Sequence, residues 1–202
     1  MLATHGSGAA LFDNRVVISV AIAKPHFRAA VLAAYVLTVE WTRTLVSGTP
    51  RAVAPALILG GLALAVAATG WPLSRLGLGT SGLPLRIVGG LALGAVLILP
   101  TAVRAGSAPI LPASLALAAV AVSIGEELAF RGALYAALEE IGGAPLAVVG
   151  STALWTAAHA LSHPAEFLGA VAAAGLLLAL WRWACKDLVG PVIAHVLADL
   201  TL

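Results

Sequence analysis

The chain has 202 residues, of which 61% are apolar and 10% charged, and its nine acidic and eleven basic side chains give a formal net charge of +2. Soluble domains are about half apolar and about a quarter charged. So few charges cannot cover a water-facing surface, and the chain must therefore be surrounded by lipid. The positive excess is too small and too dispersed to form the basic stripe that a nucleic-acid partner requires, which excludes that class. The single cysteine, Cys185, excludes an internal disulfide and a multi-cysteine metal site.

The apolar stretches predict an all-α integral membrane protein, with a bundle of about seven transmembrane helices. Each stretch approaches the length of about 20 residues that a helix needs to cross a bilayer. The stretches lie near residues 29–47, 52–70, 87–103, 109–138, 145–162, 165–183 and 188–202. Residues 1–28 are expected to form a flexible or interfacial lead, and residues 29–202 a single transmembrane domain. The glycines and prolines of residues 71–86 mark a solvent-exposed linker.

The lysines and arginines that flank the predicted helices favour a cytoplasmic N-terminus. In that orientation seven of them lie on the cytoplasmic side, where basic residues gather in membrane proteins, and three on the other. The seven are Arg15, Lys24, Arg28, Arg75, Arg86, Arg182 and Lys186, and the three are Arg43, Arg51 and Arg104. We therefore expect the protein in the plasma membrane with its N-terminus in the cytoplasm.

Ionisable side chains within the predicted helices are the candidates for function. Each costs about 2.5 to 3.5 kcal/mol on insertion scales, so such residues are rare and tend to be functional. They gather in the C-terminal half of the chain, on three helices: Glu126, Glu127 and Arg131 on the fourth, His159 on the fifth, His195 and Asp199 on the seventh. Glu40 and Arg43, near the end of the first helix, are interpreted as interfacial charges, and His163 as a solvated loop residue.

The spacing of the paired glutamates predicts different tasks for them. Glu127 and Arg131 are four residues apart, in the acid-first order that favours an ion pair on one helix face. Glu126 would point about 140° away from Arg131 around an α-helix. It is therefore the carboxylate without a counter-ion on its own helix, and the candidate general base.

The predicted helix ends place the polar residues at a common depth. Glu126 lies twelve residues before an expected turn near 138, and His159 fourteen residues after 145, which is about 18 and 21 Å from the same membrane side. His195 and Asp199, counted from residue 188, lie at about 10 and 16 Å from that side. The four side chains can meet near mid-membrane, in the cytoplasmic half.

Together these residues resemble the CAAX protease and bacteriocin-processing (Abi) family of intramembrane glutamate proteases, over roughly residues 108–202. The family signature is Glu-Glu-x-x-x-Arg, then Phe-x-x-x-His, then His-x-x-x-Asn or Asp on successive helices. The chain matches the first element and the third in full. In the second element it keeps His159 but has Trp155 in place of the usual phenylalanine.

The resemblance implies a role for each catalytic residue. Glu126 would deprotonate a water molecule, His159 would hold and polarise that water, and His195 would help to stabilise the oxyanion. The family's CAAX prenyl-protein peptidases have an asparagine where this chain has Asp199, and an ionised aspartate can only accept hydrogen bonds. Asp199 would either be protonated or orient His195.

The remaining motif residues are expected to support the site. Glu127 and Arg131 would be an ion pair that fixes the helix, and Trp155 would either wall the pocket or pack as an ordinary core residue. The resemblance implies membrane-delivered substrates, either CAAX-type protein C-termini or leader and bacteriocin-like peptides. The predicted function is therefore an intramembrane endopeptidase without a metal or other cofactor, with the lipid bilayer and a membrane-associated peptide as its partners.

Two other functions fit the same residues. Glu126, His159 and His195 could bind Zn²⁺, because two histidines and a carboxylate are a catalytic ligand set, although the chain has no His-Glu-x-x-His motif. A non-catalytic membrane protein, either an immunity factor that binds a peptide or a scaffold, is the second alternative. A proton-coupled transporter is disfavoured, since the chain shows no inverted repeat.

Overall fold

The computed structural model describes residues 24–79, 81–102 and 111–201, and the described residues contain helices but no strand. The helices in chain order are α2 (Pro25–Val46), α3 (Pro50–Val66), α4 (Leu73–Leu76), α5 (Leu83–Ala102), α6 (Ala113–Glu126), the π-helix η1 (Glu127–Leu134), α7 (Tyr135–Ala158), the 3₁₀ turn η2 (His159–Leu161), α8 (Ala165–Cys185) and α9 (Val189–Thr201). The predicted all-helical fold is confirmed. The expected N-terminal lead covers residues 1–28. Its first 23 residues lie outside the described part of the chain, and residues 25–28 belong to α2.

The helix ends follow from local residue chemistry. Pro25 and Pro50 occupy the first positions of α2 and α3, where a missing N–H has no cost. Helix α2 therefore begins four residues earlier than the apolar pattern predicts. Within α7, Gly142 (φ −138°) and Gly143 (φ +67°, ψ −167°) leave helical geometry, and Pro145 follows them. This break separates the fourth predicted span from the fifth.

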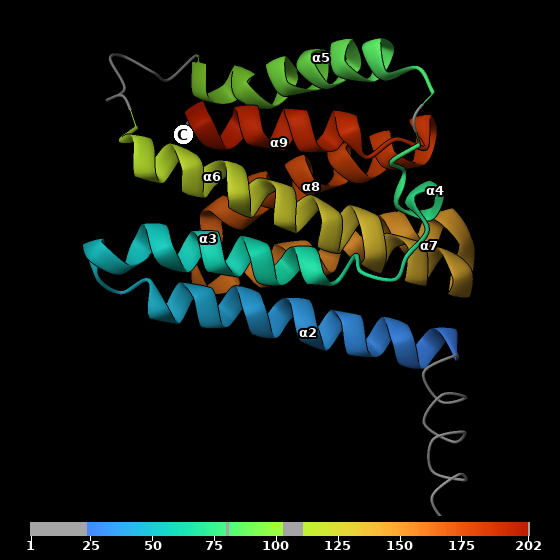
Figure 1. Ribbon diagram of the computed structural model, residues 1–202, viewed down its shortest axis with the longest axis horizontal. Helices are drawn as coiled ribbons and strands as arrows, with labels where there is room; N and C mark the ends of the chain where they lie inside the picture. Colours follow the sequence, from blue (N-terminus) through green and yellow to red (C-terminus); the bar gives the residue numbers. More distant parts are fainter. Residues whose placement is uncertain (1–23, 80, 103–110, 202) are drawn as a thin grey trace, which may run out of the picture.

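The helices run side by side as a bundle with α2 and α5 at its two edges (Figure 1). Between these edges α3, α6 and α9 form one layer, and α7 and α8 lie behind it. A very close approach of α3 to α6 depends on two glycines. A Cβ atom on Gly61 would lie 2.4 Å from the carbonyl oxygen of Ala121, and one on Gly125 would lie 2.1 Å from the carbonyl oxygen of Gly61. Gly125 immediately precedes Glu126, so this contact fixes the helix that carries the first motif.

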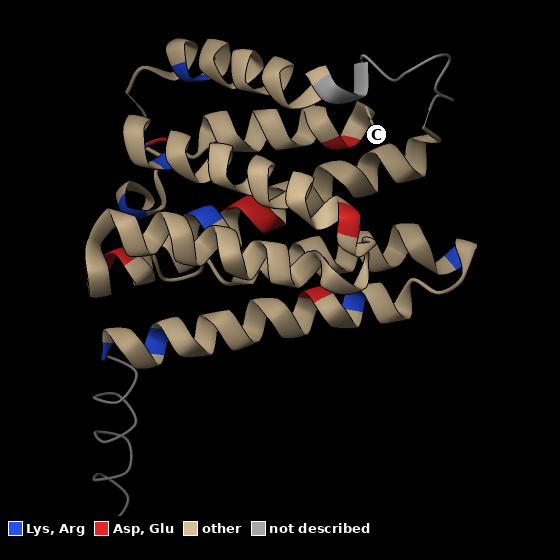
Figure 2. Ribbon diagram, turned by 180° about the vertical axis from the view of Figure 1, so that it is seen from behind, with Lys and Arg blue, Asp and Glu red and all other residues tan. Residues whose placement is uncertain are grey.

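The outside of the bundle is suited to lipid. Three helical segments are long and apolar enough to cross a membrane, namely Pro25–Val46, Ala113–Leu161 and Ala165–Cys185, and the second of these contains the break at Gly142. The shorter apolar helices are Pro50–Val66, Leu83–Leu99 and Val189–Thr201. Large apolar side chains stay exposed on both the long and the shorter segments, for example Leu45 and Leu85 at 74% and 77%. Charged residues are sparse along the helices (Figure 2). The chain is an integral membrane protein.

The α3–α6 contact predicts unequal effects of two glycine substitutions. Gly61→Ala should lower the free energy of unfolding by about 1–3 kcal/mol, because the added methyl group overlaps the α6 backbone. Gly169→Ala in α8 is the matched control, since its Cβ would meet nothing within 4 Å. It should be neutral or stabilise the helix by about 0.5–1 kcal/mol. Equal stability of the two variants in detergent micelles would contradict the tight packing.

Candidate active site

The Glu-Glu-x-x-x-Arg motif lies where α6 passes into the π-helix η1, which begins at Glu127. Seven of the eight residues of η1 are buried. A π-helix is a rare, wider turn that is frequent at functional sites. The prediction of α-helical spacing through this motif is wrong for η1. The wider turn changes the directions in which Glu126, Glu127 and Arg131 point.

The carboxylate of Glu126 is held at both of its oxygens. Trp155 donates its indole N–H to Oε2 at 2.7 Å, and Arg43 donates from Nη2 to Oε1 at 2.9 Å. Glu126 is only 3% exposed. It has no counter-ion on its own helix, as predicted, but α2 supplies one from a residue that the sequence analysis placed at the membrane interface.

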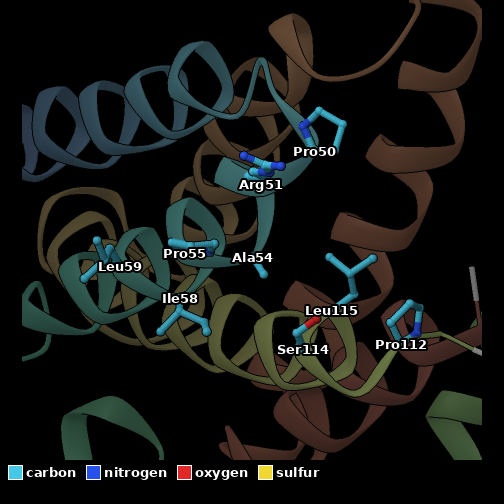
Figure 3. A pocket seen from close by; sticks show the side chains of 9 residues that line it. All are labelled: Pro50, Arg51, Ala54, Pro55, Ile58, Leu59, Pro112, Ser114 and Leu115. Atoms are coloured by element: carbon cyan, nitrogen blue, oxygen red, sulfur yellow. The ribbon is translucent and has the colours of Figure 1, made fainter.

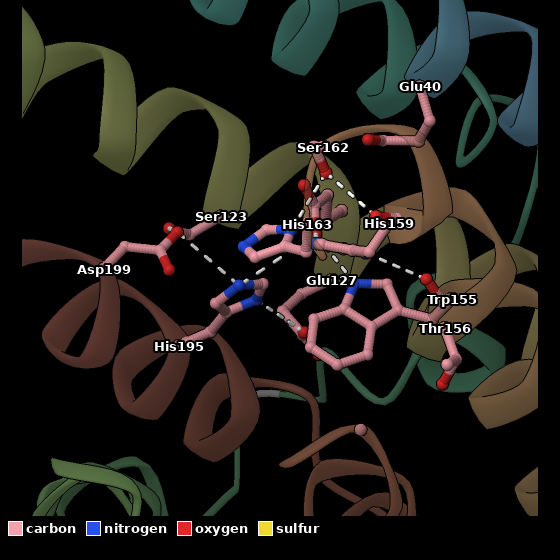
Figure 4. A network of polar contacts seen from close by, with 12 residues as sticks. Glu40, Ser123, Glu127, Trp155, Thr156, His159, Ser162, His163, His195 and Asp199 are labelled. Atoms are coloured by element: carbon pink, nitrogen blue, oxygen red, sulfur yellow. Dashed lines mark hydrogen bonds and ion pairs between the residues drawn. The ribbon is translucent and has the colours of Figure 1, made fainter. Parts of the chain in front are cut away.

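Both motif histidines present Nε2 to this carboxylate. His159 Nδ1 lies 2.8 Å from the carbonyl oxygen of Trp155, which can only accept, so Nδ1 carries the proton. Its Nε2 lies 3.8 Å from Glu126 Oε2. His195 Nε2 lies 4.0 Å from the same oxygen. The structure thus brings Glu126, His159 and His195 together from three helices, as Figure 4 shows for the two rings.

Glu127 has two partners rather than one. Its Oε1 accepts from Arg131 at 3.0 Å and lies 2.9 Å from His195 Nδ1. The predicted Glu127–Arg131 ion pair is confirmed, and both side chains are fully buried. Arg131 also donates to the carbonyl of Gly175 and lies 4.3 Å from the centroid of the Trp155 ring. The ion pair therefore orients a candidate catalytic histidine as well as fixing its helix.

Asp199 lies at the open edge of the cluster. Ser123 donates its hydroxyl to Asp199 Oδ2 at 2.7 Å, and the same oxygen lies 3.5 Å from His195 Nε2. The orienting contact on His195 Nδ1 belongs to Glu127. Asp199 instead faces Nε2 of His195, the ring nitrogen that also points toward Glu126.

A cavity of about 420 Å³ connects these residues to one end of the bundle. It is lined by Arg43, Thr44, Ser47, Val53, Leu57, Val122, Glu126, His159, Leu161, Ser162, His163, His195 and Asp199. A larger hollow of about 740 Å³ between α3 and the start of α6 is lined by none of the predicted site residues, and Arg51 is its one charged side chain (Figure 3). The four predicted catalytic residues thus all line the smaller cavity.

The turn before the fifth predicted span lies further along the chain than expected. Glu126 lies sixteen residues before the break at Gly142, rather than the twelve residues expected from a turn near 138. His159 is only two residues from the last residue of η2. The Gly142 break lies at the same end as the start of α2, since Arg28 pairs with Glu140. The site therefore lies further along the bundle from the N-terminal end of α2 than the sequence predicts, because the turn comes later than residue 138.

One further expectation needs correction. Glu40, interpreted as interfacial, is 1% exposed, and its ion pair with Arg43 lies inside the bundle rather than at the interface. His163, interpreted as a solvated loop residue, does lie partly exposed in the loop after η2; it also lines the cavity and stacks on Phe167, with its ring centroid 5.3 Å from that of His159. The sequence signal was present, since an acidic and a basic residue in an apolar span are as unusual in α2 as in α6.

Among the described residues, no group of three or more histidine, cysteine, aspartate or glutamate side chains has an arrangement that could hold a metal ion. Zinc has ligand bonds of about 2.0–2.2 Å to nitrogen and oxygen. Glu126, His159 and His195 point toward a common space, but their ligand atoms do not form a group that could hold a metal ion. The zinc alternative therefore requires these side chains to move closer together.

Residues 108–201 match the family model for type II CAAX prenyl endopeptidase Rce1-like proteins. The match covers the three motifs and agrees with the family resemblance of the sequence. Comparison with curated proteins and with solved structures gave no match. The family match supports an intramembrane protease function.

The buried Glu127–Arg131 pair predicts a strong charge effect on stability. Arg131→Met should lower the free energy of unfolding by about 3–5 kcal/mol, because it leaves a carboxylate buried without its counter-ion. The charge-neutral double variant Glu127→Met/Arg131→Met should recover most of that loss. Denaturant unfolding in micelles measures both. A double variant less stable than Arg131→Met would show that the unpaired charge is not the cause of the lost stability.

Proposed function

Because residues 108–201 of this chain belong to the Rce1-like family of type II CAAX prenyl endopeptidases, we propose that the protein hydrolyses peptide bonds with a water activated by Glu126. The observation that carries the proposal is the convergence of one buried carboxylate oxygen and two imidazole Nε2 atoms, at 3.8 and 4.0 Å, inside a cavity. Neither separation is a direct hydrogen bond. Separations of this kind suit a bridging water.

Glu126 and His159 activate that water. Glu126 Oε2 takes one of its protons, and His159 Nε2, with its Nδ1–H held by the Trp155 carbonyl, accepts the other as a hydrogen bond. The water oxygen attacks the peptide carbonyl and forms a tetrahedral intermediate. The proton taken by Glu126 then passes to the leaving amine as the C–N bond breaks, so the carboxylate is regenerated.

His195 and Asp199 stabilise the intermediate. When doubly protonated, His195 donates Nδ1–H to Glu127 and directs Nε2–H toward the oxyanion. Asp199 helps as a donor only when it carries a proton, and otherwise it holds His195 through Nε2. Glu127 and Arg131 keep the ring in place. These roles assign one task to each charged residue of the motifs.

The substrates proposed are peptides delivered from the membrane, either CAAX-type protein C-termini or leader and bacteriocin-like peptides. The cavity suits them because Val53, Leu57, Val122 and Leu161 give it apolar walls beside the charged cluster. An extended apolar peptide could lie along these walls with one carbonyl at Glu126.

We place the protein in the plasma membrane with its N-terminus in the cytoplasm. At the end where α2 begins, the described basic residues are Lys24, Arg28, Arg75, Arg86, Arg182 and Lys186, and this excess favours the cytoplasm. The cavity extends toward the other end, which carries the loop of residues 47–49. In this orientation leader and exported peptides are the substrates that reach it most directly.

The orientation can be tested with the single cysteine of the chain. Cys185 is exposed at the end of α8. A membrane-impermeant maleimide should label it in inverted vesicles but not in intact cells. Cys185→Ser/Thr49→Cys, with the thiol in the loop of residues 47–49, should show the opposite pattern. Labelling of Cys185 in intact cells would reverse the orientation and favour CAAX-type C-termini as substrates.

The base assignment predicts the effect of Glu126→Gln. This nearly isosteric change should reduce kcat by about 10² to 10⁴-fold, since it removes the group that accepts the proton. Glu166→Gln, on an exposed carboxylate at the start of α8, is the control and should leave kcat unchanged. Peptide cleavage by purified protein in liposomes measures both variants. Wild-type cleavage by Glu126→Gln would exclude Glu126 as the base.

The two alternatives make different predictions. A zinc protease would lose activity with a chelator and regain it with Zn²⁺, whereas the glutamate mechanism is unaffected by either. A non-catalytic peptide-binding or scaffold protein would keep full biological activity in a folded Glu126→Ala variant.

A further inference from the structure

Helix α2 lies outside the segment that matches the family model, yet it contributes a charged side chain to the site. Arg43 Nη2 donates to Glu126 Oε1 at 2.9 Å, and the same nitrogen pairs with Glu40 one turn earlier on α2. The Arg43 side chain is 10% exposed and lines the cavity together with Glu126. An arginine from the N-terminal half of the chain therefore contacts the proposed base directly.

A glycine on α3 makes room for this arginine. A Cβ atom on Gly60 would lie 2.5 Å from Cδ of Arg43 and 3.1 Å from its Cγ. The aliphatic part of Arg43 thus lies against the bare backbone of α3 on its way to Glu126. Helix α2 thus supplies this side chain, and α3 leaves the space that it occupies.

The charge arrangement is more than a pair within α2. Glu40 is almost fully buried and would need Arg43 as a counter-ion in any case. An ion pair that only stabilised α2 would need no contact beyond the one between Glu40 and Arg43. Here the second hydrogen of the same nitrogen is directed to a carboxylate 83 residues away on α6. Figure 4 shows Glu40 pointing toward the cluster that contains His159 and His195.

The geometry determines which oxygen of Glu126 is free for chemistry. Arg43 occupies Oε1, so the carboxylate cannot rotate without losing a charge-assisted hydrogen bond. Oε2 then stays directed at His159 and His195 while it accepts from Trp155. Without Arg43, only the Trp155 indole would restrain the group.

We propose that Arg43 is a positioning residue that holds Glu126 in its reactive orientation, that Glu40 holds Arg43, and that α2 and α3 therefore complete the active site. The inference rests on the proposed function, because it assumes that Glu126 is the base. It assigns a mechanistic task to the part of the chain that the family motifs do not cover.

The test compares three variants with a peptide that the wild-type protein cleaves and Glu126→Gln does not. Arg43→Met alone raises the buried negative charge of the trio formed by Glu40, Arg43 and Glu126, and it is used only with a measurement of folding. Glu40→Met/Arg43→Met keeps the net charge of the trio at that of the wild type and replaces a buried pair with apolar side chains of similar length, which is usually tolerated. Gly60→Ala leaves both charges in place but displaces Arg43.

The double variant leaves Glu126 without its counter-ion, so its folding is measured first. In the folded double variant KM should stay at the wild-type value, while kcat falls by about 10- to 100-fold, the size of loss seen when residues that orient metal ligands are removed. Gly60→Ala should also lower kcat in the wild type but have no further effect in the double variant, because both changes act through Arg43. Arg75→Met, at the surface ion pair with Glu140, is the control and should leave kcat unchanged.

If Arg43 had a purely structural role, removing it from a folded protein would leave kcat unchanged. A folded Glu40→Met/Arg43→Met variant with wild-type kcat would overturn the proposal, and so would a Gly60→Ala effect of equal size with and without Arg43. These outcomes would leave Glu126 as the base. If instead Glu126→Gln cleaved every peptide that the wild type cleaves, the proposed function itself would fail.

Discussion

Most of the site depends on how one buried carboxylate is compensated. Glu126 is almost completely removed from solvent, and an ionised group there must be paired and hydrogen-bonded. Arg43 and Trp155 satisfy its two oxygens from α2 and α7. To do so, three helices must meet at one depth, and the glycines of α3 allow α2 and α6 to approach closely enough. The packing of the N-terminal half follows from this requirement.

The paired glutamates differ in what surrounds them. Glu127 is tied to Arg131 and His195 in the interior of the bundle, where it has a structural and orienting task. Glu126 faces the cavity with both imidazole Nε2 atoms near one of its oxygens. They can face an interior ion pair and a cavity at the same time because adjacent residues on a helix point about 100° apart around its axis. This division supports an acid–base role for Glu126 alone.

The sequence was sufficient for the helices and for the motif residues, and insufficient for contacts between distant helices. Hydropathy predicts the membrane helices because lipid requires apolar residues over a whole span. It places their ends less well, since the turn between the fourth and fifth, expected near residue 138, lies at Gly142 and Gly143. Spacing predicts neighbours within one helix, such as Glu127 and Arg131. The Arg43–Glu126 contact joins residues 83 positions apart and leaves no periodicity to detect. The hydrogen bond of Trp155 could have been anticipated, since a buried indole N–H needs an acceptor.

The most direct test of the central claim is peptide release from membranes suspended in H₂¹⁸O, with the wild-type protein and with Glu126→Ala. The account predicts peptides that appear only with the wild type and that carry one ¹⁸O atom in a newly formed terminal carboxyl group, because the attacking oxygen comes from water. The same peptides, labelled to the same extent in both membranes, would contradict it.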